Sequence, residues 1–233
     1  MQSKQLLHVV FTGLLLSFNC QFIQDASAES SNPTTGVPKV KTPVKRGVQF
    51  AKVQIPSVDL TLQEVASLDK RIVKIRDTLH GTRKSIHTLI GGDRPKFKNE
   101  LQGFLKSGAL SITQKDGLPS LKFKKKKQSG RAFEVYQSMK NLEQSIRFSK
   151  DQLPALTKNL KQLHQKSQTV LERAPSELRQ SVQTGKIELT EINVYLKKVN
   201  NNTLLLKKVP LHLEQVKTQI VKNTTLIKNL FQK

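Results

Sequence analysis

The chain has 233 residues, a formal net charge of +23, an aromatic content of 5% and no tryptophan. This composition is typical of packed helices and argues against an aromatic-rich globular core. The only cysteine, Cys20, lies within the first 28 residues, so the rest of the chain can form no disulfide and has no thiol nucleophile. The excess of positive charge indicates anionic partners.

Residues 1–28 have the pattern of a secretory signal peptide. Lys4 supplies the early positive charge, residues 6–18 are mainly apolar, and Ala26-Ser27-Ala28 has small residues where a signal peptidase requires them. The apolar stretch is shorter than the ~20 residues that span a bilayer. We therefore expect cleavage after Ala28 and export to the periplasm or the medium. Retention as a membrane anchor is the alternative.

Residues 29–57 are predicted to form an extended tether. The segment contains four prolines, which lack an amide donor and favour extended geometry in the residue before them. Near its end, residues 47–55 alternate imperfectly between apolar and polar side chains. This alternation predicts a short edge strand.

Branched apolar residues then recur with a period of seven in three blocks. A strict period of seven keeps one stripe of a helix facing a partner helix, so it predicts coiled-coil or bundle packing. It predicts no chemistry. The blocks are Val58, Val65, Ile72, Leu79 and Ile86; Met139, Ile146, Leu153 and Leu160; and Ile192, Val199, Leu206, Leu213, Ile220 and Ile227.

The first block predicts a coiled-coil helix over residues 58–90, which the pair Gly91-Gly92 should end. Residues 91–130 break the period and are predicted to form a basic insert. Within it we expect a short helix over about 95–106, followed by a β-hairpin that turns at Asp116-Gly117.

Residues 131–233 are predicted to form the second and third coiled-coil helices, over roughly 131–173 and 176–231. Pro154 should kink or split the second helix, and Pro175 suggests a restart. Gly185 and Pro210 are weak points of the third helix. The predicted fold class is therefore mainly α: a long antiparallel helical bundle or coiled coil of about three helices, with a small α+β-hairpin insert.

A run of basic residues at the end of the insert is the candidate binding site. It carries six positive charges and no acid, which predicts binding of an anion or an acidic partner. The alternative is a solvated run that only promotes solubility. The candidate residues are Lys122, Lys124, Lys125, Lys126, Lys127 and Arg131.

A second basic segment, residues 195–233, could act as an amphipathic helix on a membrane surface. We favour a bundle helix with a cationic outer face.

No motif predicts catalysis, a cofactor or a metal ion. The histidines His80 and His87 lie about 10.5 Å apart along one predicted helix, too far to share a metal. The carboxylates are sparse, and the sequence has no glycine-rich phosphate loop, nucleophile elbow or cysteine–histidine spacing. We therefore expect a protein that is not an enzyme.

These features predict an exported structural or adaptor protein that docks through a basic surface. The expected partner is an anionic envelope polymer, lipid headgroups or an acidic protein. The apolar stripes with a period of seven also allow homo-oligomers. Nucleic acid fits the charge but not export. A membrane-active toxin with a hairpin tongue ranks low, because residues 110–127 are lysine-rich.

The alternative function is a periplasmic holdase chaperone for unfolded membrane proteins. In composition and architecture alone, the chain resembles exported coiled-coil chaperones of the Skp kind, whose helical tentacles surround a β-rich base.

Overall fold

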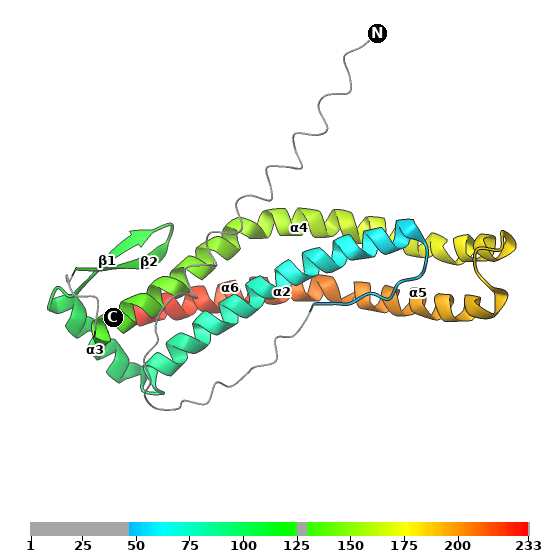
Figure 1. Ribbon diagram of the computed structural model, residues 1–233. Helices are drawn as coiled ribbons and strands as arrows, with labels where there is room; N and C mark the ends of the chain where they lie inside the picture. The colour runs from blue at the N-terminus through cyan, green and yellow to red at the C-terminus, as the bar shows by residue number, and fades with distance from the viewer. Residues whose placement is uncertain (1–46, 125–129, 233) are drawn as a thin grey trace, which may run out of the picture. The chain divides into compact units, whose positions relative to one another are not determined.

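The computed structural model describes residues 47–124 and 130–232. This part is mainly helical and contains one two-stranded antiparallel sheet, which confirms the predicted fold class at this level (Figure 1). The signal segment, residues 29–46 of the tether and Lys125, Lys126 and Lys127 lie outside the described residues. The elements are α2 (Pro56–Ile90), α3 (Arg94–Lys106), β1 (Leu110–Lys115), β2 (Leu118–Phe123), α4 (Arg131–Gln183), the 3₁₀ turn η1 (Leu189–Glu191), α5 (Ile192–Leu206) and α6 (Lys208–Phe231).

Both ends of α2 follow local signals. Pro56 occupies the first turn, where its missing amide hydrogen leaves no helical bond unmade. At the other end Gly91 adopts the left-handed conformation, with φ of 64°, and its amide donates to the carbonyls of His87 and Thr88. Glycine enters this region without the steric cost of a Cβ atom, so the diglycine ends the helix as predicted.

The helix α4 runs unbroken from Arg131 to Gln183, so it does not split at Pro154 and the predicted restart at Pro175 is wrong. The alternative outcome at Pro154, a kink, stays a prediction. Each proline leaves one helical carbonyl without its amide partner. However, buried leucines continue on both sides of the two prolines, from Leu142 to Leu178. Burial of this apolar stripe offsets the lost hydrogen bonds and keeps the helix continuous.

The third helical segment begins at Ile192, later than predicted, after a turn in which Gly185 has φ of 71°. It breaks once, between Leu206 and Lys208. Pro210 lacks the amide that would bond the Leu206 carbonyl, so the proline falls in the first turn of a new helix. The predicted weak point at Pro210 is therefore present as a break between α5 and α6.

The period of seven marks the buried faces of these helices. The five first-block residues, Val58 to Ile86, are all fully buried, and the second and third blocks are buried except for partly exposed Leu153 and Ile192. Helix α2 packs against α4 and α6, and α4 also packs against α5. The apolar stripes therefore face one another.

Polar contacts between the helices give their directions. Glu64 bonds Lys166 and Thr82 bonds Ser145, so α2 and α4 run antiparallel. Asp69 bonds His212, and the Leu79 carbonyl accepts from Asn223. Helices α2 and α6 therefore run in the same direction.

Residues 47–55, here called the strap, form no strand, so the predicted edge strand is wrong. The strap is held by side chains. Asn202, fully buried on α5, accepts from the Ala51 amide at 2.9 Å and donates to the Ala51 carbonyl at 2.8 Å. Val48 donates its amide to Asp69 at 2.7 Å. A carboxamide and a carboxylate thus take the place of a neighbouring strand.

Replacement of Asn202 by alanine should loosen the strap. The change leaves both backbone groups of Ala51 without their protein partner, which should lower the free energy of unfolding by about 2 kcal/mol. Urea denaturation followed by circular dichroism measures this change. Asn201→Ala is the matched control, because Asn201 is the exposed neighbour on the same helix. Equal stability of the two variants would contradict the anchoring role.

Candidate anion-binding surface

The β-hairpin of the insert is formed by a tight two-residue turn. Asp116 and Gly117 both have positive φ, 50° and 69°, as a type I′ turn requires. Lys115 and Leu118 face each other across the turn. The hairpin lies beside the first part of α4 (Figure 1), and β2 packs against α4 and α6. Leu118 and Leu121 of β2 are buried.

Arg147 of α4 fixes the turn of the hairpin to the helix. Its guanidinium donates to the carboxylate of Asp116 and to the carbonyl of Lys115. A third bond, of 2.8 Å, joins it to Glu143, which is almost buried one turn earlier on α4. One cation therefore satisfies two carboxylates and a backbone carbonyl.

All three acidic residues of the insert are engaged in such structural contacts. Asp93 accepts from the amide of Lys96 at 2.9 Å and caps α3. Glu100 pairs with Arg131 at 3.0 Å, and Asp116 pairs with Arg147. Within the described part of the chain, none of these carboxylates is paired with a lysine side chain.

The lysines of the insert are arranged differently. Lys106, Lys115, Lys122 and Lys124 are exposed, and none of them forms a salt bridge with another described residue. Lys115 and Lys122 lie on the same face of the hairpin. Lys122 is opposite Ser111, and Lys115 is four residues from Ser111 on β1, so their side chains point to the same side. The result is a surface with exposed lysines that are in no salt bridge within the described chain.

Arg131 differs from the lysines of the basic run to which it belongs in sequence. It pairs with Glu100 at 3.0 Å and Glu134 at 3.4 Å, and it donates to the Leu89 carbonyl at 2.8 Å. The hydrogen bond that Arg131 donates to Glu100 raises the pKa of Arg131 above its ordinary value, although burial opposes this. Arg131 thus joins the end of α2, α3 and the start of α4.

A buried polar contact elsewhere had no signal in the sequence. Asp69 is fully buried and lies 2.7 Å from Nδ1 of His212, 143 residues later in the chain. The same carboxylate holds Val48 of the strap. Among the described residues, no group of three His, Cys, Asp or Glu side chains could hold a metal ion.

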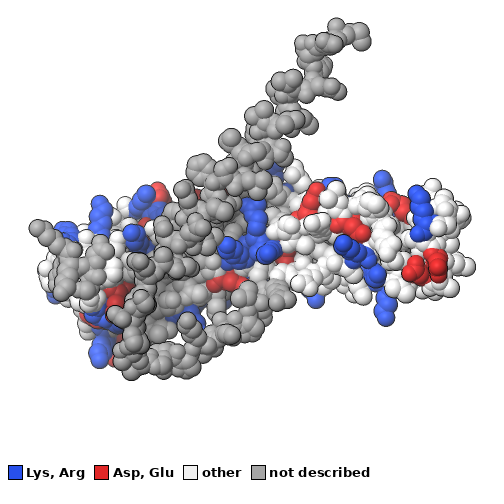
Figure 2. All heavy atoms as spheres, in the orientation of Figure 1, with Lys and Arg blue, Asp and Glu red and all other residues white. Residues whose placement is uncertain are grey.

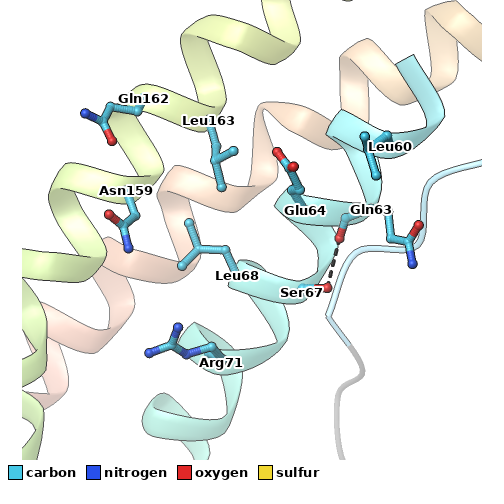
Figure 3. Close-up of a pocket in the computed structure, with 9 residues that line it drawn as sticks. All are labelled: Leu60, Gln63, Glu64, Ser67, Leu68, Arg71, Asn159, Gln162 and Leu163. Carbon is cyan, nitrogen blue, oxygen red and sulfur yellow. Dashed lines mark hydrogen bonds between the residues drawn. The ribbon is translucent and has the colours of Figure 1, made fainter. Parts of the chain in front are cut away.

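A groove of about 620 Å³ lies between α2 and α4. Leu68 and Leu163 point into the space between the helices, and polar side chains surround them (Figure 3). Its single carboxylate, Glu64, is paired with Lys166 at 3.1 Å. The groove therefore brings together no pair of acidic groups for general acid–base chemistry. Its lining residues are Leu60, Gln63, Glu64, Ser67, Leu68, Arg71, Asn159, Gln162 and Leu163.

Among the described helices, none has both the length and the apolar character needed to cross a membrane. Comparisons with models of protein families, with curated proteins and with solved structures found no match.

Arg147→Met should loosen the hairpin from α4. The variant leaves the almost buried Glu143 without a cation, and we expect the free energy of unfolding to fall by about 2 kcal/mol. Amide hydrogen exchange in β1 and β2 should accelerate. Arg179→Met provides the control, because Arg179 is exposed on the same helix and is in no salt bridge with the described residues. Unchanged exchange in the hairpin would refute this role for Arg147.

Proposed function

We propose that this chain is an exported, non-enzymatic adaptor that presents a basic hairpin to an anionic partner. Helices α2, α4 and α5–α6 form the scaffold, which we interpret as an antiparallel three-helix bundle. The directions of the helices and the buried seven-residue stripes support this interpretation. The proposal of export rests on the sequence of residues 1–28 alone.

The observation that carries the proposal is the difference in pairing between the acidic residues and the lysines of the insert. Its carboxylates hold a helix cap and two arginines, whereas its exposed lysines have no carboxylate partner among the described residues. Figure 2 shows Lys and Arg side chains distributed along the visible face, with acidic side chains between them. An uncompensated basic surface raises the local concentration of anions and speeds the association of acidic partners.

Replacement of Lys122 and Lys124 by glutamine should weaken binding to a polyanion. Heparin is a suitable probe, and the variant should elute from immobilised heparin at a clearly lower salt concentration, because fewer counterions are released on binding. Lys158→Gln with Lys161→Gln is the matched control. These two lysines are exposed on α4, so the control removes the same net charge from another surface.

Circular dichroism should show the same helical content for both double variants. If the two variants elute together, the hairpin has no special role in anion binding and the effect reflects net charge. If neither variant shifts from the wild-type position, the proposed function is wrong for this surface.

A holdase chaperone is the second candidate function, and the distribution of exposed apolar side chains favours it. Five of the eight large exposed hydrophobic residues in the described chain lie between Leu189 and Val221. Leu204 near the end of α5 and Leu211 near the start of α6 are 59% and 60% exposed. Exposed apolar surface of this kind can bind unfolded chains.

Leu204→Ser with Leu211→Ser should reduce any holdase activity. The measurement is light scattering during dilution of an unfolded outer-membrane protein, with and without the chain. If the second candidate is correct, wild type suppresses aggregation and the double variant suppresses it less. Phe148→Ser is the control, because Phe148 is also exposed but lies on α4. Aggregation that wild type leaves unchanged would eliminate this candidate.

A further inference from the structure

The backbone of β1 has an edge that the hairpin does not use. In a two-residue hairpin the residues flanking the turn form a hydrogen-bonded pair, here Lys115 and Leu118. Such pairs alternate along an antiparallel ladder. Thr113 and Ser111 therefore also bond to β2, whereas the backbone groups of Ile112 and Gln114 point away from it.

Two observations support this phase of the ladder. The amide of Lys124 donates to the carbonyl of Ala109 at 3.1 Å, which continues the alternation past the end of the strands. Pro119 lies opposite Gln114, and proline has no amide hydrogen to donate. A proline at a non-hydrogen-bonded position leaves the ladder between the strands intact.

The two outer edges of the hairpin differ. Because Pro119 has no amide hydrogen, the outer edge of β2 has one donor fewer, and this strand packs against α4 and α6. By contrast, Ile112 and Gln114 on β1 are exposed, and β1 pairs with no strand other than β2 in the described chain. An open edge with regularly spaced donors and acceptors can pair with another extended chain.

The side chains around this edge define the chemistry of a partner. Thr113 and Lys115 point to one face of β1, with Lys122 across the ladder on the same face. Ile112, which is 39% exposed, points to the other face. The nearby carboxylate, Asp116, is already paired with Arg147. An added strand would therefore meet lysines on one face and an apolar side chain on the other.

We propose that β1 binds an extended acidic segment of a partner protein as a third, edge strand of the sheet. The segment alternates acidic residues, which face the lysines, with apolar residues, which lie beside Ile112. This inference rests on the proposed function and specifies its partner. The open edge favours a peptide over a lipid or a polysaccharide, because only a peptide backbone repeats amides and carbonyls at strand spacing.

The probe is a capped synthetic peptide of alternating glutamate and valine, and its binding to the full chain is measured by fluorescence anisotropy. Gln114→Pro removes one outward amide of β1 without removing a bond to β2, so affinity for the peptide should fall about tenfold. Gln114→Ala keeps the amide and should bind as wild type does. Hydrogen exchange of the β1–β2 ladder shows whether the proline variant keeps its hairpin.

Peptides N-methylated at alternate residues test the same geometry without changing the protein. An added strand donates to β1 only from every second residue, so methylation in one phase should abolish binding and methylation in the other phase should preserve it. Equal binding of both methylated peptides would overturn strand addition. The comparison of the two methylated peptides uses the wild-type chain, so it tests strand addition even if the Gln114→Pro variant loses its hairpin.

The outcomes separate this inference from the proposed function. Strand addition predicts that Gln114→Pro weakens binding of the peptide and leaves heparin elution unchanged. Lys122→Gln with Lys124→Gln should weaken binding of both the peptide and heparin. Retained peptide affinity in a folded Gln114→Pro variant overturns strand addition alone. If the variant with Lys122→Gln and Lys124→Gln binds both the peptide and heparin as wild type does, the proposed function is overturned as well. Tighter binding to phosphatidylglycerol vesicles than to the peptide would assign the surface to lipid and overturn the inference.

Discussion

The structure depends on the mutual burial of long apolar stripes. The predicted exported portion contains no cysteine, and the chain has few aromatic residues, so neither disulfides nor large rings can replace this contact. Branched side chains at every seventh position bury completely along α2 and are largely buried along α4 and α5–α6. This burial keeps α4 continuous through two prolines, although each proline removes a backbone hydrogen bond.

Local sequence signals predicted the parts of the fold that local geometry decides. The diglycine after Ile90 and the Asp116-Gly117 turn need positive φ, and few other residues adopt it easily. The three buried stripes followed directly from periodicity. Predictions failed where tertiary packing decides the outcome, as at Pro175, where the helix does not restart, and at Pro154, where it does not split. The predicted edge strand at residues 47–55 also failed, because Asn202 and Asp69, which hold Ala51 and Val48, are remote in sequence.

The candidate surface was predictable only in outline. A run of lysines is visible in the sequence, but the sequence does not show which cations are already paired. Arg131 belongs to that run and nevertheless forms bonds with Glu100, Glu134 and the Leu89 carbonyl. Lys115 lies outside the run, yet the hairpin register places it on the same face as Lys122. The register of the hairpin therefore adds Lys115 to the basic surface, and the ion pairs of Arg131 remove that residue from it.

The strap gives the helical part a mechanical property. Its polar contacts lie in sequence order, with Val48 on Asp69, Ala51 on Asn202, and Val53 and Gln54 on Asp59. A force that pulls Gly47 away from the helices would load the Val48–Asp69 contact first and the contacts of Ala51, Val53 and Gln54 after it. The contacts of Val48 and Ala51 can therefore break first, while Val53 and Ile55 of the strap stay buried in the apolar core of the helices.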